Sequence, residues 1–144
     1  MLSSMAFTFQ HAVDTAAKPE AVWRLYSDVS TWSQWDHAVE RVTLDGPFEA
    51  GSAGSMKLHG QDPFAYRLLE VEPRRSFTDE SAIPGGVVRF RHHIEPLDGG
   101  RSRLTHAVEI EAPPAVAEQV GAMITAGVPE TMTQLAALAE EATP

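Results

Sequence analysis

Cysteine is absent from the sequence, which excludes a disulfide framework, a thiol nucleophile and any metal centre held by thiolates. No apolar run approaches the roughly twenty residues that a membrane-spanning helix needs. Positive charge is scarce, because 11 Lys and Arg residues stand against 20 Asp and Glu residues and give a formal net charge of −9. A nucleic-acid groove would have to form against this field, so we expect no nucleic-acid partner.

Several motifs that carry chemistry are also missing. The chain has no glycine-rich phosphate loop leading into a helix with a lysine, no His-x-x-x-His pair and no Gly-x-Ser-x-Gly elbow. We therefore expect no cofactor and no metal. Residues 1–6 contain no Lys or Arg ahead of a long apolar stretch, so they do not resemble a secretory signal, and we expect a cytoplasmic protein.

The 144 residues, 43% of them apolar, match the usual size of one compact domain. We expect residues 1–5 to form a disordered or frayed tail and residues 6–144 to form a single domain. The sequence leaves open whether the protein is a monomer or a homodimer.

The pattern of apolar residues predicts a strand, two short helices, six strands and one long helix. Alternation over residues 7–13 indicates the first strand, and Pro19 suits the first position of a helix. Turn signals then recur at intervals too short for parallel crossovers, which favours an antiparallel meander. Over residues 114–141 apolar residues recur at intervals of three and four residues, which is the pattern of an amphipathic helix. Pro129 predicts a kink or a break in this helix.

The last two predicted strands indicate their own register. Apolar and charged residues alternate in residues 87–94 and 104–110, so each strand has one polar and one apolar face. A three-residue loop over residues 98–100 sets three pairs opposite each other: Arg89 with Glu109, Glu95 with Arg103, and His92 with His106. A two-residue loop would break both charge pairs and set apolar residues opposite polar ones, so we prefer the three-residue loop.

Several short motifs, in this order and spacing, carry a resemblance to a known superfamily. They are Lys18-Pro19-Glu20-Ala21-Val22-Trp23, Ser27-Asp28, Trp32 and Trp35, Asp45-Gly46-Pro47-Phe48 with Gly51 and Gly54, Glu70-Val71-Glu72-Pro73, residues 90–96, and Gly100-x-x-Arg103-Leu104-Thr105. Together they resemble the START-like (SRPBCC) superfamily, in its polyketide cyclase/dehydrase-like branch. The resemblance implies an α+β helix-grip fold, in which a curved seven-stranded antiparallel sheet with two short helices grips one long C-terminal helix around a cavity for an apolar ligand.

Histidines are the candidates for proton chemistry. His92 and His106 face each other on the apolar side if the register holds, and His11 lies on the apolar face of the first strand. They are candidate catalytic residues for general acid–base transfer, and the alternative is that each is a core residue bonded to backbone, to a tyrosine or to water. Asp79 and Glu80 are adjacent on a strand, so one of them must face inward, and the sequence does not decide which.

Ten further residues are candidates for the wall of a ligand cavity. They are Trp32, Trp35, Met56, Phe90, Val108, Ile110, Val120, Met123, Ile124 and Gly127. Those of the last two strands and the last helix are expected to surround one interior space. Tryptophan and methionine are equally suited to packing a core, and a helical glycine can equally permit a close approach to the sheet.

Three functions remain open from the sequence. The leading hypothesis is a protein that binds a small apolar or aromatic metabolite, polyketide-like or lipid-like, in an internal cavity. The alternative is a polyketide cyclase or dehydratase that uses cavity histidines for proton transfer. The third is a protein-interaction module whose cavity is vestigial.

Overall fold

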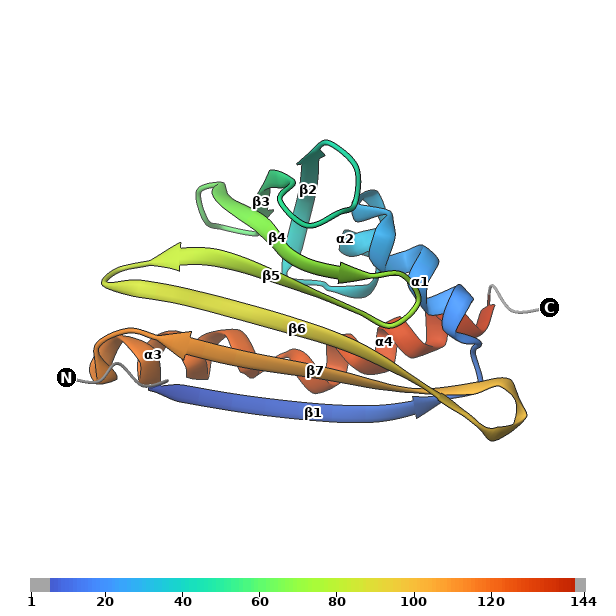
Figure 1. The fold of residues 1–144 in the computed structure, drawn as a ribbon. Helices are drawn as coiled ribbons and strands as arrows, with labels where there is room; N and C mark the ends of the chain where they lie inside the picture. Colours follow the sequence, from blue (N-terminus) through green and yellow to red (C-terminus); the bar gives the residue numbers. More distant parts are fainter. Residues whose placement is uncertain (1–5, 142–144) are drawn as a thin grey trace.

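The computed structural model describes residues 6–141 (Figure 1), so the tail expected over residues 1–5 lies outside it. The strands are β1 (Phe7–Thr15), β2 (Val39–Asp45), β3 (Ala53–Leu58), β4 (Phe64–Glu72), β5 (Ser76–Ile83), β6 (Gly86–Leu97) and β7 (Arg101–Glu111). The helices are α1 (Pro19–Ser27), α2 (Trp32–Trp35), α3 (Pro114–Thr125) and α4 (Val128–Glu141), with a short 3₁₀ turn (Val29–Thr31) before α2. This is the predicted order of elements.

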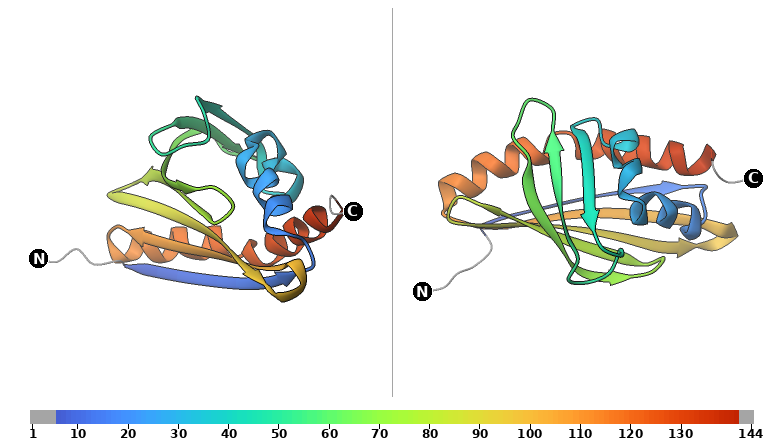
Figure 2. Two further views of the ribbon diagram at one scale, coloured as in Figure 1. Left: turned by 45° about the vertical axis from the view of Figure 1, so that its right-hand side comes forward. Right: turned by 90° about the horizontal axis from the view of Figure 1, so that it is seen from above.

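All seven strands form one antiparallel sheet in the order β1-β7-β6-β5-β4-β3-β2. The sheet bends so that β2, β3 and β4 turn away from the plane of β1 and β7, while α3 and α4 run along its inner face (Figures 1 and 2). We call the face toward α3 and α4 the inner face and the opposite one the outer face. The predicted helix-grip fold is confirmed.

The C-terminal helical region is interrupted, as Pro129 predicts. Helix α3 ends at Thr125 and α4 begins at Val128. Pro129 has no N–H to donate to the carbonyl of Thr125, so the backbone ladder resumes only where the N–H of Thr131 bonds the carbonyl of Gly127 at 2.9 Å. The long helix is therefore two consecutive segments along the same face of the sheet.

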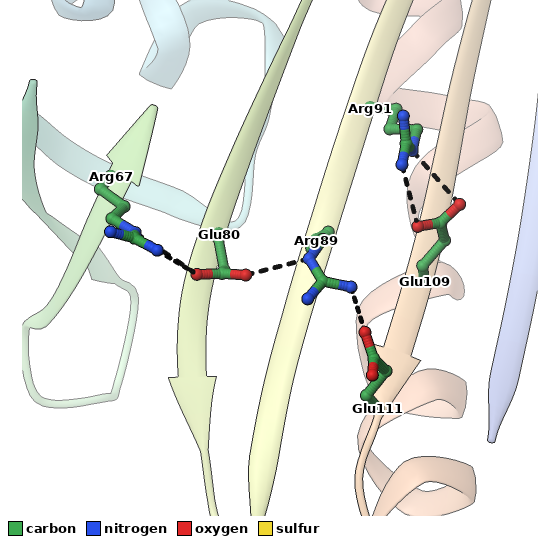
Figure 3. Close-up of polar contacts among 6 residues, drawn as sticks. All are labelled: Arg67, Glu80, Arg89, Arg91, Glu109 and Glu111. Atoms are coloured by element: carbon green, nitrogen blue, oxygen red, sulfur yellow. Dashed lines mark hydrogen bonds and ion pairs between the residues drawn. The ribbon is translucent and has the colours of Figure 1, made fainter. Parts of the chain in front are cut away.

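The register of β6 and β7 is the predicted one, with Arg89 opposite Glu109 and His92 opposite His106. The ion pairs differ from the expected ones, because long side chains on the outer face reach diagonal neighbours as well as direct ones. Arg89 contacts Glu80 across the β5–β6 pair and Glu111 on β7, and Arg91 contacts Glu109 (Figure 3). Arg103 likewise pairs with Asp14 on β1.

The inner face is covered in two different ways. Where α3 rests on the sheet, the side chains pack without a gap. Gly121 lets the helix approach the Phe7 ring closely, because a Cβ at position 121 would lie only 2.6 Å from that ring. Val108, Ile110 and Ala117 are fully buried there. Nearer to α2 and α4, aromatic side chains form the larger core, and the space beside them is hollow.

Candidate functional site

A cavity of about 400 Å³ lies between the inner face of the sheet, α2 and the junction of α3 and α4. Its volume is within the range of small-molecule sites. Exposed side chains that include His37, His59 and Gln61 form its entrance. Here His37 lies 3.7 Å from Glu130 and so links the segment after α2 to α4.

The structure brings most of the expected wall residues to this cavity. They are Trp32, Trp35, Met56, Phe90, Met123, Ile124 and Gly127, together with His92 and His106. Gly127 has no atom within 4 Å of the position a Cβ would take, so it faces open space, whereas Gly121 serves the close contact with Phe7. Met123 is 60% exposed and lies at the outer margin of the cavity.

Val108, Ile110 and Val120 do not line the cavity. They belong to the closely packed region where α3 rests on the sheet, in which Val108 and Ile110 are fully buried. The expectation of one shared interior space is therefore wrong. Alternation places these residues on the correct face of the sheet, but α3 rests directly on that part of the face and fills it.

The two candidate catalytic histidines are cross-strand neighbours in the cavity wall. Their ring centroids are 4.6 Å apart, and the side chains are 6% and 3% exposed for His92 and His106. His11 stands opposite His106 on β1, so three imidazoles form a row across three strands. Burial, reinforced by the neighbouring His11, lowers the pKa of His106 to about 3, and burial with the neighbouring His106 lowers the pKa of His92 well below 6.5. Both rings are neutral at neutral pH.

The hydrogen bonds of the two histidines differ. The Nε2 atom of His106 lies 2.8 Å from the hydroxyl oxygen of Tyr26 on α1, so this ring is tied to the core by a tyrosine. Nδ1 of His92 lies 3.4 Å from the carbonyl oxygen of Phe77. A carbonyl oxygen can only accept, so Nδ1 of neutral His92 carries the proton and Nε2 keeps a lone pair. His92 is therefore the better placed of the two to accept a proton or a hydrogen bond from a ligand.

Asp79, rather than Glu80, is the carboxylate that faces inward. Pro84 and Gly85 form the turn between β5 and β6, with Gly85 at a φ of 77°, and this two-residue turn sets Asp79 opposite Phe90. The Asp79 side chain is 7% exposed, lines the cavity, and forms no hydrogen bond or ion pair with any residue of the described chain. Burial raises the pKa of this carboxyl to about 7, so at neutral pH it exchanges between protonated and ionised forms.

Three features of the site were not reached from the sequence. The first is the hydrogen bond from α1 to His106, because Tyr26 shows only the helical apolar spacing of a core residue. The second is the inward position of Asp79. The third is the indole N–H of Trp35, which is enclosed and has no partner among residues 6–141.

No group of three His, Asp or Glu side chains within the described range is close enough to hold a metal ion, and no helix there is long and apolar enough to span a membrane.

Solved structures share this architecture at low sequence identity. The Zhui aromatase/cyclase from Streptomyces sp. R1128 is 16% identical over 93% of this chain and 93% of that one, with a TM-score of 0.78. Norcoclaurine synthase from Thalictrum flavum is 15% identical over 94% and 87%, with a TM-score of 0.74. A protein from Thermobifida fusca solved by NMR is 23% identical over 86% and 85%, with a TM-score of 0.70. At these identities the likeness shows the fold alone.

Fold and cavity together define a START-like protein of the helix-grip class. A family model described as "Polyketide cyclase / dehydrase and lipid transport" matches residues 6–142. The chain belongs to this family. A search of curated protein sequences finds no match to it.

Proposed function

We propose that this protein binds a small aromatic or otherwise apolar molecule, such as a polyketide-like or lipid-like metabolite, in the cavity. The observation that supports the proposal is the cavity itself: about 400 Å³, open at one side, with a wall built mainly from aromatic and aliphatic side chains. An apolar cavity of about 150 Å³ already accepts benzene, so a bicyclic ring system fits this space. A cavity of this size gives no support to the interaction-module alternative.

The test fills the cavity with a larger side chain and uses the same substitution on the outer face as a control. Ser81 lines the cavity and Ala82, the next residue on β5, is exposed on the outer face. N-phenyl-1-naphthylamine, a neutral dye that becomes fluorescent in apolar surroundings, should bind the native protein and the Ala82→Trp control. It should bind Ser81→Trp at least about tenfold more weakly, because the new indole occupies the space. Equal binding to both variants would contradict the proposal.

A second candidate function is proton transfer of the cyclase or dehydratase kind. Asp79 favours it, because a carboxyl with its pKa raised to about 7 by burial suits a general acid–base at neutral pH, and His92, whose Nε2 is free to accept, lines the same cavity. In this mechanism the Asp79 carboxylate removes a proton from the carbon next to a ligand carbonyl, which leaves an enolate, and later returns the proton. His106 acts only by orienting the site, since its Nε2 is engaged by Tyr26.

Deuterium exchange distinguishes a protein that only binds its ligand from one that also catalyses proton transfer. In D₂O, 2-tetralone exchanges the protons beside its carbonyl, and the protein should accelerate this exchange if Asp79 is a base. Asp79→Asn should return the rate to that of buffer, while Glu80→Gln, which removes the same charge from the outer face, should keep the acceleration. A native protein that binds 2-tetralone without accelerating exchange would remain a carrier.

A further inference from the structure

The charged residues of the cavity wall are of one sign. Among the described residues that line it there is no Lys and no Arg, while three carboxylates, those of Asp36, Asp79 and Glu130, are present. The Asp36 carboxylate accepts a hydrogen bond of 3.0 Å from the N–H of Ala38, and Glu130 lies 3.7 Å from His37. Asp79 alone among the three has no partner within residues 6–141. The wall therefore offers no Lys or Arg side chain to an anionic ligand.

Hydrogen-bond acceptors also gather at one place in this wall. Asp79 stands opposite Phe90, and His92 lies two residues further along β6 on the same face. Diagonal neighbours of this kind are about 7–8 Å apart at the backbone, so one small group between the side chains can contact both. The Nε2 atom of His92 can only accept, because Nδ1 donates to the carbonyl of Phe77.

Donors are scarce at the same place. The indole N–H of Trp35 is enclosed by protein atoms within the wall, so it is not presented to the cavity. The hydroxyl of Tyr26 is engaged with His106. The hydroxyl of Ser81, two residues along β5 from Asp79, also lines the cavity and can donate or accept. A ligand group placed beside Asp79 and His92 thus meets two acceptors and one hydroxyl, with the aromatic ring of Phe90 as the adjoining apolar surface.

Taking the proposed function as given, we propose that the cavity selects a flat apolar ligand with a hydrogen-bond donor as its head group, either a hydroxyl that donates to Asp79 or His92 or a protonated amine that donates to both, and that it rejects carboxylates. The buried Asp79 carboxylate lacks the solvation it has in water, and a donor from the ligand restores it. A ligand carboxylate would instead place a second negative charge beside the first, with no cation to offset it.

A series of naphthalenes tests the head group while the ring stays constant. At pH 8, naphthalene, 2-naphthol, 2-naphthylmethylamine, 2-acetonaphthone and 2-naphthoate compete with N-phenyl-1-naphthylamine for the native protein. A hydrogen bond to a charged group is worth about 1.5–3 kcal/mol, so the naphthol and the amine should bind about tenfold or more tightly than naphthalene. The naphthoate should bind more weakly than naphthalene.

Variants assign the preference to Asp79. Asp79→Leu should abolish the advantage of both donor probes and leave the affinity for naphthalene unchanged or higher. Asp79→Asn should abolish the advantage of the amine, because the charge is lost while the shape is kept. Glu80→Gln removes one negative charge from the outer face and should change none of these affinities.

The outcomes separate the two proposals. If the dye does not bind the native protein, the proposed function fails and this inference falls with it. If naphthalene binds but the donor probes have no advantage, or the advantage persists in Asp79→Leu, only the head-group inference fails. Tighter binding of the acetonaphthone or the naphthoate than of the donor probes would also overturn it, since both present acceptors.

Discussion

Asp79 and Glu80 are neighbours in the sequence and have opposite surroundings. Glu80 lies on the outer face, where Arg67 and Arg89 lie 3.2 Å and 2.9 Å from its two oxygens, in a chain of charges across four strands (Figure 3). Asp79 lies on the inner face, buried and without a partner in the described chain. The outer face uses its carboxylates to join strands, whereas the inner face keeps one carboxylate unpaired at the wall of a cavity.

This difference indicates which carboxylate the fold needs. A paired carboxylate on a partly exposed face adds a little stability, and a buried unpaired one costs stability. Asp79 is thus a residue whose presence the fold does not explain, and residues of this kind concentrate at functional sites. Four measurements test the difference between the two faces of the sheet.

The largest effect is expected where the inner face is tightly packed. Phe77 is fully buried, and its ring stacks on His92 at a centroid distance of 3.9 Å. Phe77→Ala should lower the free energy of unfolding by about 3–5 kcal/mol, because it removes a large buried ring from a close-packed cluster. Urea denaturation measures this change. A loss below about 1 kcal/mol would mean that the cavity extends to Phe77 and that the inner face is not close-packed there.

Asp79→Asn should raise the free energy of unfolding, whereas Phe77→Ala lowers it. The folded protein holds the Asp79 pKa near 7 against an ordinary value of 3.8, so the unfolded chain ionises first as pH rises. Stability is therefore lost between about pH 4 and 7, and the loss is complete above pH 7. Removing the titrating group should stabilise the protein at pH 8 by up to about 4 kcal/mol, with no gain at pH 3.5. Urea denaturation at the two pH values checks this, and a destabilised variant at pH 8 would show that Asp79 has a stabilising partner.

The histidine pair should make the protein less stable as pH falls, whereas Asp79 makes it less stable as pH rises. The folded-state pKa values of His92 and His106 lie below 6.5, so the unfolded chain binds protons first as pH falls below that value. Each histidine should lower the free energy of unfolding by about 1.4 kcal/mol per pH unit, down to about pH 3 for His106. In an Asp79→Asn background, which removes the opposing titration, His106→Gln should make the slope between pH 6 and 4 shallower by that amount. An unchanged slope would show that His106 is protonated in the folded state.

The smallest effect is expected on the outer face. Glu80→Gln weakens two ion pairs on a surface that solvent reaches, so it should cost only about 0.5–1 kcal/mol, and less in high salt. Denaturation at low and high salt measures it. A cost above about 3 kcal/mol would mean that the outer charges hold the sheet together as a buried network does.

The sequence was sufficient for most of the fold. Charge pairs and apolar alternation selected one register for β6 and β7, since a slip of one residue would have turned every side chain over. The orientation of Asp79 could not be obtained in this way, because it depends on whether Gly86 belongs to the turn. Gly86 lies in β6, where a Cβ would stand 1.7 Å from the carbonyl oxygen of Glu111, so this glycine serves a close approach between strands rather than a turn.

The cavity could be predicted only in part, for a similar reason. Alternation identifies the face that a residue occupies, and it placed Phe90 and Val108 on the same face correctly. It carries no information about how closely a helix lies over that face. The approach of α3 depends on Gly121 fitting the Phe7 ring, a contact between the two ends of the chain that neither segment reveals alone.

The position of the three tryptophans gives the protein a fluorescent signal of its own. Trp32 and Trp35 are part of the cavity wall, whereas Trp23 packs against Phe48 and Phe77 and does not line it. A molecule that enters the cavity thus changes the surroundings of two indoles and leaves the third as an internal reference. In purified Trp23→Phe protein the tryptophan emission comes from the cavity wall alone, so occupancy becomes visible without a label or a known ligand.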